Sequence, residues 1–486
     1  MVSSARKLIR GLALGMAALY LAALAGCSRE TEGPLETGEP AVKLRILSVG
    51  SSGEEACQRI GKALSELTQR ELGFSVELQQ ASMAKYDSEL SQQMLLGQAP
   101  DLFCYIAPED LQNYIDEGDV FPLDSHLKDF FYLTRNVPSE VWSCVRVDNQ
   151  TYAVPANNSV NYSLGFLARA DIVEELGIDP SQVTTWDGLH DVLLRVKAAY
   201  PDMVPVVPHF GQTHQTLGQD PLGNDLGVLL DNKGTVVENL YASEQYAEMC
   251  ARMHQWYEEG LILKDASMTG EAASRMVKLY NGFGFFIRLS DNNIVSNTRS
   301  VGQEMVAFEL GGPIANSSSV NLGWCVSPTS QYKQQAMQLL ELLYTNQEAA
   351  DLCIYGQEGV DYTRIDADTV TNIDTPPQDE WSTIHWGWPN RQVASVWRLP
   401  DKETPKLALK GAQRSPAMGF VFNSAPVQSE VDRCKAVADK YHNVLMSGYL
   451  DPADALPRFL TELEEAGIET VIAEKQRQLN DWLAAR

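Results

Sequence analysis

Three short apolar runs near the start of the chain alternate with two amphipathic helical stretches, and this alternation constrains the fold more than any other feature. The apolar runs are 42–49, 74–78 and 100–106, and the helical stretches are 54–72 and 86–96. In the first helical stretch, apolar residues recur at spacings of three and four, as on the buried face of a helix. The β-α-β-α-β order predicts an α/β fold with a parallel sheet covered by helices. Ligands of such sheets bind beyond the carboxyl ends of the strands.

The remainder of the chain supplies enough further elements for a second lobe. With 44% hydrophobic residues, the roughly 440 residues after the N-terminal segment favour two lobes over a single core. A new region begins at 151–155. After it we expect a strand followed by a helix in 163–179, a helix with an N-cap threonine in 184–201, a hairpin in 228–237 centred on Asp231 to Gly234, strands at 283–287 and 322–328, helices at 243–259, 271–281 and 331–345, and a helical tail over 429–486.

The first 27 residues carry three signals in a fixed order. Arg6, Lys7 and Arg10 form a positive region, the uncharged apolar run 11–25 follows, and Leu-Ala-Gly stands directly before Cys27. The run is shorter than the about 20 residues that a membrane-spanning helix needs, and it suits a secretory signal peptide. LAGC resembles the bacterial lipobox, which implies removal of 1–26 and a thioether-linked lipid on Cys27. An ordinary membrane span and a simple signal peptide are the alternatives.

Charge and composition exclude some partners. Residues 28–40 contain almost nothing to bury, so 27–42 is expected to be a flexible tether that spans roughly 20 Å on average. Loss of 1–26 removes three positive charges and no negative one, which takes the net charge from −26 to −29. Such an acidic chain lacks the cationic surface that nucleic acid requires. We therefore expect no nucleic-acid partner, and attachment to a membrane has to come from the lipid.

The sequence contains no assembled catalytic set or metal site. His209 with His214, and Cys250 with His254, supply two potential ligands each, short of the three or four that a metal needs. Neither G-x-x-x-x-G-K-[ST] nor G-x-S-x-G occurs, so neither a P-loop nor a hydrolase nucleophile elbow is predicted. Seven cysteines besides Cys27, without C-x-x-C spacing, indicate buried small hydrophobic residues. We expect neither a cofactor nor a metal.

Several phrases, in one order along the chain, carry a resemblance to a known family. They are the LAGC lipobox, LGQAPDLFCYI, YAVPANNSVNYSLGFLARADIVEELGID with TTWDGL, VNLGWCVSPTSQYKQQAMQLLELLYTN with IYGQEGVDY, and AGIETVIAEKQRQLNDWLA. Together they resemble the extracellular solute-binding proteins of ATP-binding-cassette (ABC) importers. The resemblance is to the carbohydrate-binding group that includes the maltodextrin-binding proteins, and it is strongest to LipO-type lipoproteins.

The resemblance implies a two-lobe periplasmic-binding-protein-like fold of type 2, with the ligand in a cleft between the lobes. It implies lobe 1 from 43–150 with 313–350, and lobe 2 from 151–312 with 351–486, including the C-terminal helices. The implied function is that of a monomer, not an enzyme, on the extracytoplasmic face of a bacterial cell membrane. It would capture a carbohydrate, expected to be an oligosaccharide, by hinge closure and deliver it to permease subunits on separate chains. The alternatives are a peptide- or polyamine-binding lipoprotein of the same fold and a glycan-active surface enzyme.

Five candidate ligand residues lie near the ends of the first and third strands. The resemblance places a first ligand loop at Ser51, Ser52 and Gly53, where hydroxyls and backbone amides suit sugar hydroxyls. A plain strand-to-helix turn is the alternative. Asp101 and Tyr105 bracket the third strand, and Tyr105 falls where relatives place a stacking aromatic ring. Asp101 would otherwise only cap or brace its loop.

Five more candidates lie beyond the expected crossover into the second lobe or on later strands. Asn157, Asn158 and Tyr162 offer amides and a phenol, and amides both donate and accept hydrogen bonds as sugar hydroxyls do. A turn is the alternative there. Trp324 faces either the cleft or the core. Arg288 follows a wholly apolar strand, where a lone charge needs a partner or a ligand.

Four of the nine tryptophans fall within 381–397. In an extended segment residues two apart share a face, so Trp386 and Trp388 would form one platform. The C–H face of a pyranose suits an aromatic ring, and Asn390 and Arg391 would reach hydroxyls at its rim. LipO-type relatives resemble this region with a tryptophan, a further aromatic residue and an asparagine. The flanking Trp381 and Trp397 are assigned to packing, and a hydrophobic cluster of all four tryptophans is the alternative.

Overall fold

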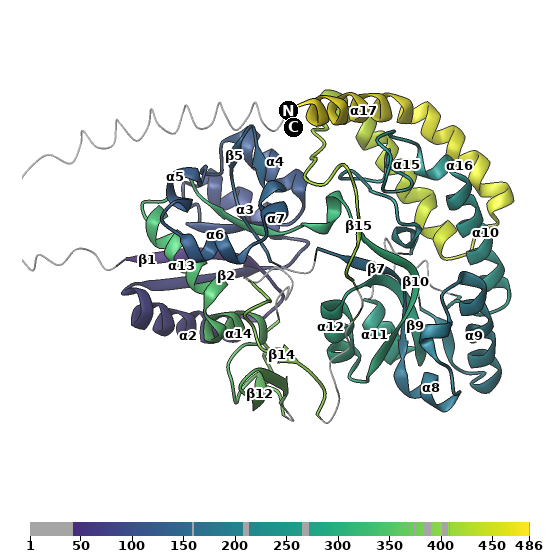
Figure 1. Cartoon of the computed structure of the whole chain (residues 1–486), viewed down its shortest axis with the longest axis horizontal. Helices are drawn as coiled ribbons and strands as arrows, with labels where there is room; N and C mark the ends of the chain where they lie inside the picture. The colour runs from purple at the N-terminus through teal and green to yellow at the C-terminus, as the bar shows by residue number, and fades with distance from the viewer. Residues whose placement is uncertain are drawn as a thin grey trace, which may run out of the picture.

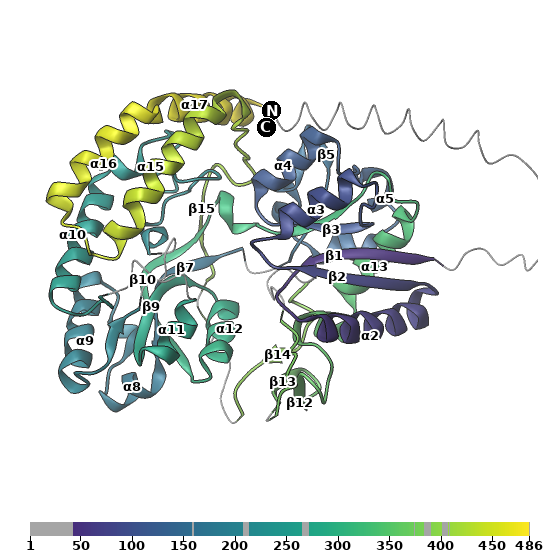
Figure 2. The same ribbon diagram turned by 180° about the vertical axis from the view of Figure 1, so that it is seen from behind.

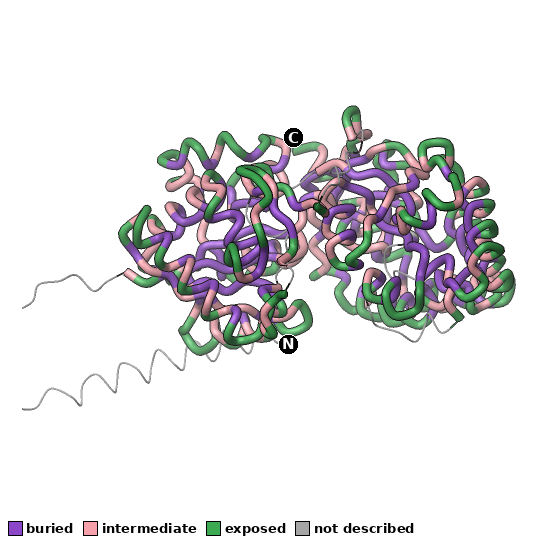
Figure 3. The backbone as a smooth tube through the Cα atoms, turned by 90° about the horizontal axis from the view of Figure 1, so that it is seen from below, coloured by how far each residue is buried: buried purple, intermediate pink, exposed green. Residues whose placement is uncertain are grey.

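The structure is a computed structural model that describes residues 42–157, 160–207, 213–264, 272–373, 375–382, 390–400, 407 and 409–485. These residues form two α/β lobes that lie side by side, each around its own sheet (Figure 1). The view from behind shows the same two bodies, joined near their centre (Figure 2). Each lobe has its own buried core (Figure 3). The expected two-lobe α/β fold is confirmed, while the signal segment, the tether and Cys27 lie outside the described residues.

Lobe 1 begins with the predicted β-α-β-α-β unit. Its sheet has the order β2-β1-β3-β11-β6, with β1 parallel to β2 and β3, and β11 antiparallel to β3 and β6. Apolar side chains on both faces of β1 are buried because helices cover the sheet on both sides. The elements are β1 (Lys43–Val49), α2 (Glu54–Leu72), β2 (Ser75–Ala81), α3 (Tyr86–Leu95), β3 (Leu102–Tyr105), α4 (Pro108–Glu117), α5 (Asp124–Leu127), α6 (Phe131–Asn136), α7 (Ser139–Ser143), the small β4 (Arg146–Val147) and β5 (Gln150–Thr151), β6 (Val154–Pro155), β11 (Gly323–Val326), α13 (Lys333–Thr345) and α14 (Gln347–Tyr355).

Lobe 2 has a sheet of the order β15-β10-β7-β9-β8, in which β7 runs antiparallel to β10 and β9. The predicted N-cap is Thr185, whose Oγ1 accepts a 3.1 Å hydrogen bond from the Gly188 amide at the start of α9. The elements are β7 (Tyr162–Arg169), α8 (Ala170–Glu175), α9 (Trp186–Ala199), β8 (Val204–Val206), α10 (Glu244–Glu258), α11 (Ala273–Leu279), β9 (Gly282–Leu289), α12 (Asp291–Val301), β10 (Met305–Ala315), β15 (Gln413–Arg414), α15 (Gln428–Met446), α16 (Pro452–Ala466) and α17 (Ile468–Ala484).

The chain passes between the lobes at three points. Lobe 1 strand β6 is followed by β7 of lobe 2, and β10 of lobe 2 is followed by β11 of lobe 1. A small third sheet, of β12 (Tyr362–Asp366), β13 (Thr369–Asn372) and β14 (Val396–Trp397), lies beside lobe 1 and precedes β15 of lobe 2 (Figure 1). Residues next to these crossings are the ones that a hinge between the lobes would use.

The boundary between the lobes differs from the expected one. Residues 351–400 were expected in lobe 2, but Tyr355, Tyr362, Val370, Trp381 and Trp397 belong to the lobe 1 core. Residues 151–156 likewise belong to lobe 1, because β6 pairs with β11. This boundary depends on long-range packing. Helix α14 follows α13 of lobe 1, and the chain after α14 folds back onto it. Its hydrogen bonds include one of 2.7 Å from the Tyr355 hydroxyl to the Ser395 carbonyl.

The hairpin predicted over 228–237 is also different. The turn is present, since the Asp231 carboxylate accepts hydrogen bonds from the amides of Lys233 and Gly234 at 3.0 and 2.9 Å. The flanking residues form only an isolated antiparallel bridge between Val228 and Glu238. The Asn232 side chain donates instead to the carbonyls of Ala315 and Gln413, which ties this loop to the edge of the lobe 2 sheet.

The tail is helical, as predicted, and packs on lobe 2. Ile468, Val471 and Leu479 of α17 are fully buried and form an apolar stripe on that helix. Lys475 lies on the same stripe, is also fully buried, and donates to the carbonyls of Asn224 and Gly227 at 3.0 and 2.8 Å. In Figure 1 the three helices α15 to α17 (yellow) arch over lobe 2. Within the described ranges, no helix is both long and apolar enough to cross a bilayer.

Candidate ligand-binding site

The predicted first ligand loop is fastened to the segment that leads into the tryptophan pair. The Ser51 amide donates to the Ser382 carbonyl at 3.1 Å, and the two hydroxyl oxygens lie 2.9 Å apart. The Ser52 hydroxyl donates to the same carbonyl at 2.9 Å and lies 2.8 Å from the Ser382 amide nitrogen, which donates to it. Residues 383–389, with Trp386 and Trp388, lie outside the described residues and follow Ser382 directly.

The other end of that segment is fastened to the predicted asparagine loop. Asn157 forms a parallel β-bridge with Asn390, and its Nδ2 donates to the Asn390 Oδ1 at 2.9 Å. The Asn390 Nδ2 donates in turn to the Tyr344 carbonyl at 3.0 Å, in α13. Asn158 lies outside the described residues. Two separate regions that the sequence singled out therefore hold the two ends of the tryptophan segment.

On the lobe 2 side, Arg288 and Tyr162 form a pair next to the crossing segments. The Arg288 guanidinium carbon lies 4.6 Å from the centroid of the Tyr162 ring, and Nη1 donates weakly to the Ser318 carbonyl at 3.4 Å. The Arg288 Nε is buried without a hydrogen-bond partner among the described residues. The Tyr162 hydroxyl accepts from Asn316 at 2.9 Å, and burial raises its pKa. The Arg288 guanidinium therefore packs on the Tyr162 ring, while its Nε–H group has no acceptor among the described residues.

A cavity of about 390 Å³ lies between the lobes, next to both ends of the tryptophan segment. Arg299 of α12 reaches across, donating to the Asn372 Oδ1 at 3.0 Å, with its guanidinium 5.9 Å from the Tyr355 ring. Burial lowers the pKa of Arg299, and Tyr355 and Glu380 oppose that shift. The lining combines aromatic rings with side chains of both charges: Lys278, Val295, Ser296, Arg299 and Ser300 from lobe 2, and Tyr355, Asp361, Asn372, Ile373, Pro376, Glu380, Trp381, Ser382, Arg391 and Trp397 from the lobe 1 side.

Three predicted ligand residues are enclosed in lobe 1. Tyr105 and Trp324 are 1% and 0% exposed, and both belong to the lobe 1 core. The Tyr105 hydroxyl has no hydrogen-bond partner in the described structure, and burial raises its pKa well above the usual range. Asp101 accepts from the Arg45 amide at 2.8 Å and from the Ser330 hydroxyl, which is the bracing role considered as its alternative. A ligand role for these three residues stays a prediction.

The packing role assigned to the outer tryptophans is confirmed. Trp381 and Trp397 are 5% and 3% exposed and belong to the lobe 1 core. Each indole also donates a hydrogen bond, from Trp381 to the Cys353 carbonyl at 3.0 Å and from Trp397 to the Asn372 Oδ1 at 3.1 Å. The seven described cysteines are free thiols, and most are buried, as expected.

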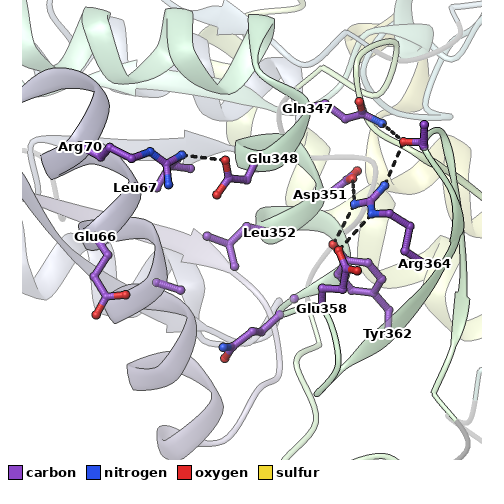
Figure 4. Close-up of a pocket in the computed structure, with 14 residues that line it drawn as sticks. Glu66, Leu67, Arg70, Gln347, Glu348, Asp351, Leu352, Glu358, Tyr362 and Arg364 are labelled. Carbon is purple, nitrogen blue, oxygen red and sulfur yellow. Dashed lines mark hydrogen bonds and ion pairs between the residues drawn. The ribbon is translucent and has the colours of Figure 1, made fainter.

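A second cavity, of about 500 Å³, lies on lobe 1 between α2 and α14 (Figure 4). Its arginines already have partners: Arg70 pairs with Glu348 at 2.7 Å, and Arg364 pairs with Asp351 at 2.9 Å and Glu358 at 3.0 Å. In the part of the chain that the structure describes, no group of three or more His, Cys, Asp or Glu side chains is arranged to hold a metal. We take the cavity between the lobes as the candidate site because residues of both lobes line it, with Ser382 and Arg391 near the two ends of the tryptophan segment.

Comparison with known proteins identifies the family of this chain. Residues 50–350 match the family described as bacterial extracellular solute-binding protein, and 416–484 match a domain of unknown function (DUF3502). The chain belongs to the bacterial extracellular solute-binding protein family. Members of this family are binding proteins rather than enzymes. The DUF3502 match coincides with α15 to α17 and the segment just before them.

Two relatives illustrate the similarity. A carbohydrate ABC transporter substrate-binding protein of Streptococcus pneumoniae is 24% identical, with 95% of this chain and 96% of that protein covered. The crystal structure of the N-glycan transport solute binding protein (NgtS) from Streptococcus pneumoniae superposes with a TM-score of 0.77 at 21% identity, covering 91% of this chain and 99% of that one. An ABC substrate-binding protein from Listeria monocytogenes in complex with cycloalternan superposes with a TM-score of 0.57 at 14% identity, covering 88% and 99%. These structural likenesses establish the fold of this solute-binding protein.

Several residues at the site were not predicted from the sequence. Ser382, Arg299 and Asn372 border the cavity, yet no motif marks them. Tyr355 also borders it and lies in the IYGQEGVDY phrase, but nothing in that phrase marks it as a ligand residue. Arg299 lies in an amphipathic helix, where an arginine is normally solvent-exposed, and Tyr355 ends a mostly buried helix. Their proximity comes from contacts between distant segments, which a local pattern does not contain.

Proposed function

We propose that this solute-binding protein captures a carbohydrate, expected to be an oligosaccharide, in the cavity between its lobes. The observation that carries the proposal is the fastening of the tryptophan segment, at Ser382 and Asn390, to the predicted serine and asparagine loops, with Ser382 and the predicted ligand residue Arg391 in the lining of that cavity. Aromatic rings suit the C–H face of a pyranose, and amides and hydroxyls suit its hydroxyl groups. The cavity lining has rings and polar groups of both kinds.

The relatives support the same ligand class. The Streptococcus pneumoniae relative is named a carbohydrate ABC transporter substrate-binding protein. NgtS structures exist in complex with Man1GlcNAc and with Man5GlcNAc, and superpose on this chain with TM-scores of 0.74 and 0.71. A solute-binding protein of this kind closes its lobes around the sugar and presents it to permease subunits on separate chains. We propose that it acts as a monomer.

We also propose that Cys27 anchors the protein, through a lipid, to the extracytoplasmic face of the cell membrane. The support is the order of the positive region, the apolar run and LAG-Cys in the sequence. Cys27→Ala should move the protein from the membrane fraction to the soluble fraction, as followed by fractionation and immunoblotting. Full retention of the variant in the membrane fraction would contradict the lipid anchor.

A thermal-shift screen over an oligosaccharide library tests the ligand class. A ligand that binds only the native state at one hundred times its Kd adds about 2.7 kcal/mol to the unfolding free energy, so a cognate sugar should raise the melting temperature. Man5GlcNAc and other oligosaccharides form the main arm, and peptides and polyamines form the second. A shift with peptides or polyamines alone would replace the carbohydrate proposal, and consumption of a glycan would make the protein an enzyme.

A further inference from the structure

Helix α17, the last of the C-terminal helices, holds a loop of lobe 2 through two neighbouring side chains. The loop spans residues 219–238, and we call it the brace loop. The fully buried Lys475 donates to the carbonyls of Asn224 and Gly227 at 3.0 and 2.8 Å. A Cβ on Gly227 would lie 3.7 Å from the Ile472 Cα, so the loop backbone passes directly against the helix. The first half of the brace loop is therefore fixed to α17.

The second half of the brace loop is fixed by Gln476. Its Oε1 accepts from the Val237 amide at 2.7 Å, and its Nε2 donates to the Thr235 carbonyl at 2.9 Å. One amide side chain thus binds both a donor and an acceptor of the loop backbone. Val237 is also buried in the lobe 2 core. One turn of α17 therefore holds both halves of the loop.

The start of the brace loop is bonded to segments where the chain crosses between the lobes. The buried Asp220 carboxylate accepts from the Ser317 amide at 3.1 Å, and the Gln219 carbonyl accepts from the Asn316 Nδ2 at 2.9 Å. Both donors lie in the crossing from β10 to β11. The Asn316 Nδ2 also donates to the hydroxyl of Tyr162 at 2.9 Å, where the crossing from β6 enters β7. The start of the loop is therefore connected to two of the three crossings.

The turn of the brace loop is bonded to the third crossing. The Asn232 Nδ2 donates to the carbonyls of Ala315 and Gln413 at 3.3 and 3.2 Å. Gln413 lies in β15, where the chain returns to lobe 2, and its Nε2 donates to the carbonyls of Asp231 and Asn232 at 3.0 and 3.1 Å. The brace loop thus connects α17 to all three crossings.

We infer that the C-terminal helices restrain the hinge between the lobes by holding the brace loop against the crossing segments. Closure of two lobes requires backbone changes in the few residues that join them. Here those residues are bonded to a loop that cannot move without breaking its bonds to α17. Helix α15 packs against both α16 and α17, and the three helices arch over lobe 2 as one support (Figure 1). The domain of unknown function matched by 416–484 thereby acquires a role in lobe movement.

Hydrogen–deuterium exchange of the full, ligand-free chain tests this restraint. Gln476→Ala removes both bonds to the second half of the brace loop. It should speed exchange about tenfold in peptides covering 228–238 and also in peptides covering 314–320, because a net hydrogen bond contributes up to about tenfold to an equilibrium constant. The radius of gyration in small-angle X-ray scattering should increase as well, since freer lobes occupy more extended arrangements.

Gln478→Ala is the matched control, because Gln478 makes the same pair of bonds inside the C-terminal domain. Its Oε1 accepts from the Asn423 amide at 2.9 Å, and its Nε2 donates to the Asn423 carbonyl at 2.8 Å. The control should lower the melting temperature about as much as Gln476→Ala does. It should leave both the exchange over 314–320 and the radius of gyration unchanged, so general destabilisation and release of the hinge are told apart.

Asn232→Gly breaks the connection at the other end of the brace loop. Asn232 has a φ of +54°, which glycine adopts readily, so the variant keeps the turn while losing the side-chain bonds. It should speed exchange over 314–320 and leave peptides covering 472–480 unchanged.

Two results would overturn the restraint. One is faster exchange in Gln476→Ala that stays confined to 228–238, with the wild-type radius, because the helices would then only cover lobe 2. The other is equal exchange over 314–320 in Gln476→Ala and Gln478→Ala. No ligand is present in these measurements, so their outcome is independent of the proposed carbohydrate ligand.

Discussion

The clustered tryptophans are expected to differ residue by residue in what they contact. Trp388 is expected on the sugar platform, whereas Trp381 is buried in the lobe 1 core and donates from its indole to Cys353. Trp388→Ala should therefore weaken oligosaccharide binding about tenfold and leave the melting temperature of the unliganded protein almost unchanged. Trp256→Ala is the matched control, because Trp256 is fully buried in the lobe 2 core and does not line the cavity, and it should lower the unfolding free energy by about 3–5 kcal/mol. Calorimetric titration and denaturant unfolding measure the two effects, and a large loss of stability in Trp388→Ala with affinity retained contradicts the platform.

At the scale of single residues, the sequence shows which side chains have the chemistry of a sugar site. It does not show whether each of them lies in a core or in a cleft. Ser51, Ser52 and Asn157 could be proposed as ligand residues because hydroxyls and amides at strand ends are typical of sugar sites. Ser382 could not, since its partners Ser51 and Ser52 are distant in the sequence and no motif marks it. Tyr105 shows the converse limit, because an aromatic ring at the end of a buried strand fits a core as well as a cleft.

At the scale of elements, helix α17 carries a buried lysine on its apolar stripe. Burial lowers the pKa of Lys475 to about 7, against the opposing effect of Asp225, Glu109 and Asp220. A lysine in an unfolded chain has a pKa of about 10.4, so between these values the unfolded chain binds more protons. The contribution of Lys475 to the free energy of unfolding is therefore fully present above about pH 10.4. It decreases as the pH falls and is lost once the pH passes below about 7.

Lys475→Met removes this titration from the helix. The difference in melting temperature between wild type and variant should shift in favour of the wild type as the pH rises from about 7 to 10, and should be constant below that window. Lys440→Met in α15 is the control, since Lys440 is exposed and pairs with Glu462 on the surface. A wild-type-to-variant difference that does not vary with pH would contradict the burial effect.

Helices and strands could be predicted where the spacing of apolar residues within a short stretch determines them. The helices of the tail and the strands of the first unit follow from apolar spacing, whereas the assignment of residues 351–400 to a lobe does not. That segment joins lobe 1 through long-range bonds such as Arg364 to Asp351 and Arg59 to Asp361. The burial of Lys475 does follow a local pattern, because the residue lies four positions after Val471 and four before Leu479, on the buried face of α17.

At the scale of the whole molecule, several contacts join the lobes, and one of them lies at Glu109 and Gly223. Glu109 at the start of α4 in lobe 1 lies against Gly223 in lobe 2, with its Oε1 buried, and burial raises the pKa of its carboxyl. The lobe 2 loop around Gly223 is fixed by Lys475, which donates to Asn224 and Gly227. It is also fixed by Asp220, which accepts from the Ser317 amide at 3.1 Å in the crossing between β10 and β11. The C-terminal helices therefore support a surface on which the two lobes meet.

Gly223→Ala tests whether this contact sets the spacing of the lobes. Gly223 has a φ of +93°, and an added Cβ would also lie 3.2 Å from the Glu109 Cδ and closer still to its Oε1. The backbone strain should lower the unfolding free energy by about 1–3 kcal/mol. The steric overlap should separate the lobes and increase the radius of gyration of the unliganded protein in small-angle X-ray scattering. The double variant Gly223→Ala with Glu109→Ala removes the overlap but not the strain, so it should regain the wild-type radius without regaining the wild-type stability. A radius equal to that of the wild type in the single variant would show that the contact does not control the distance between the lobes.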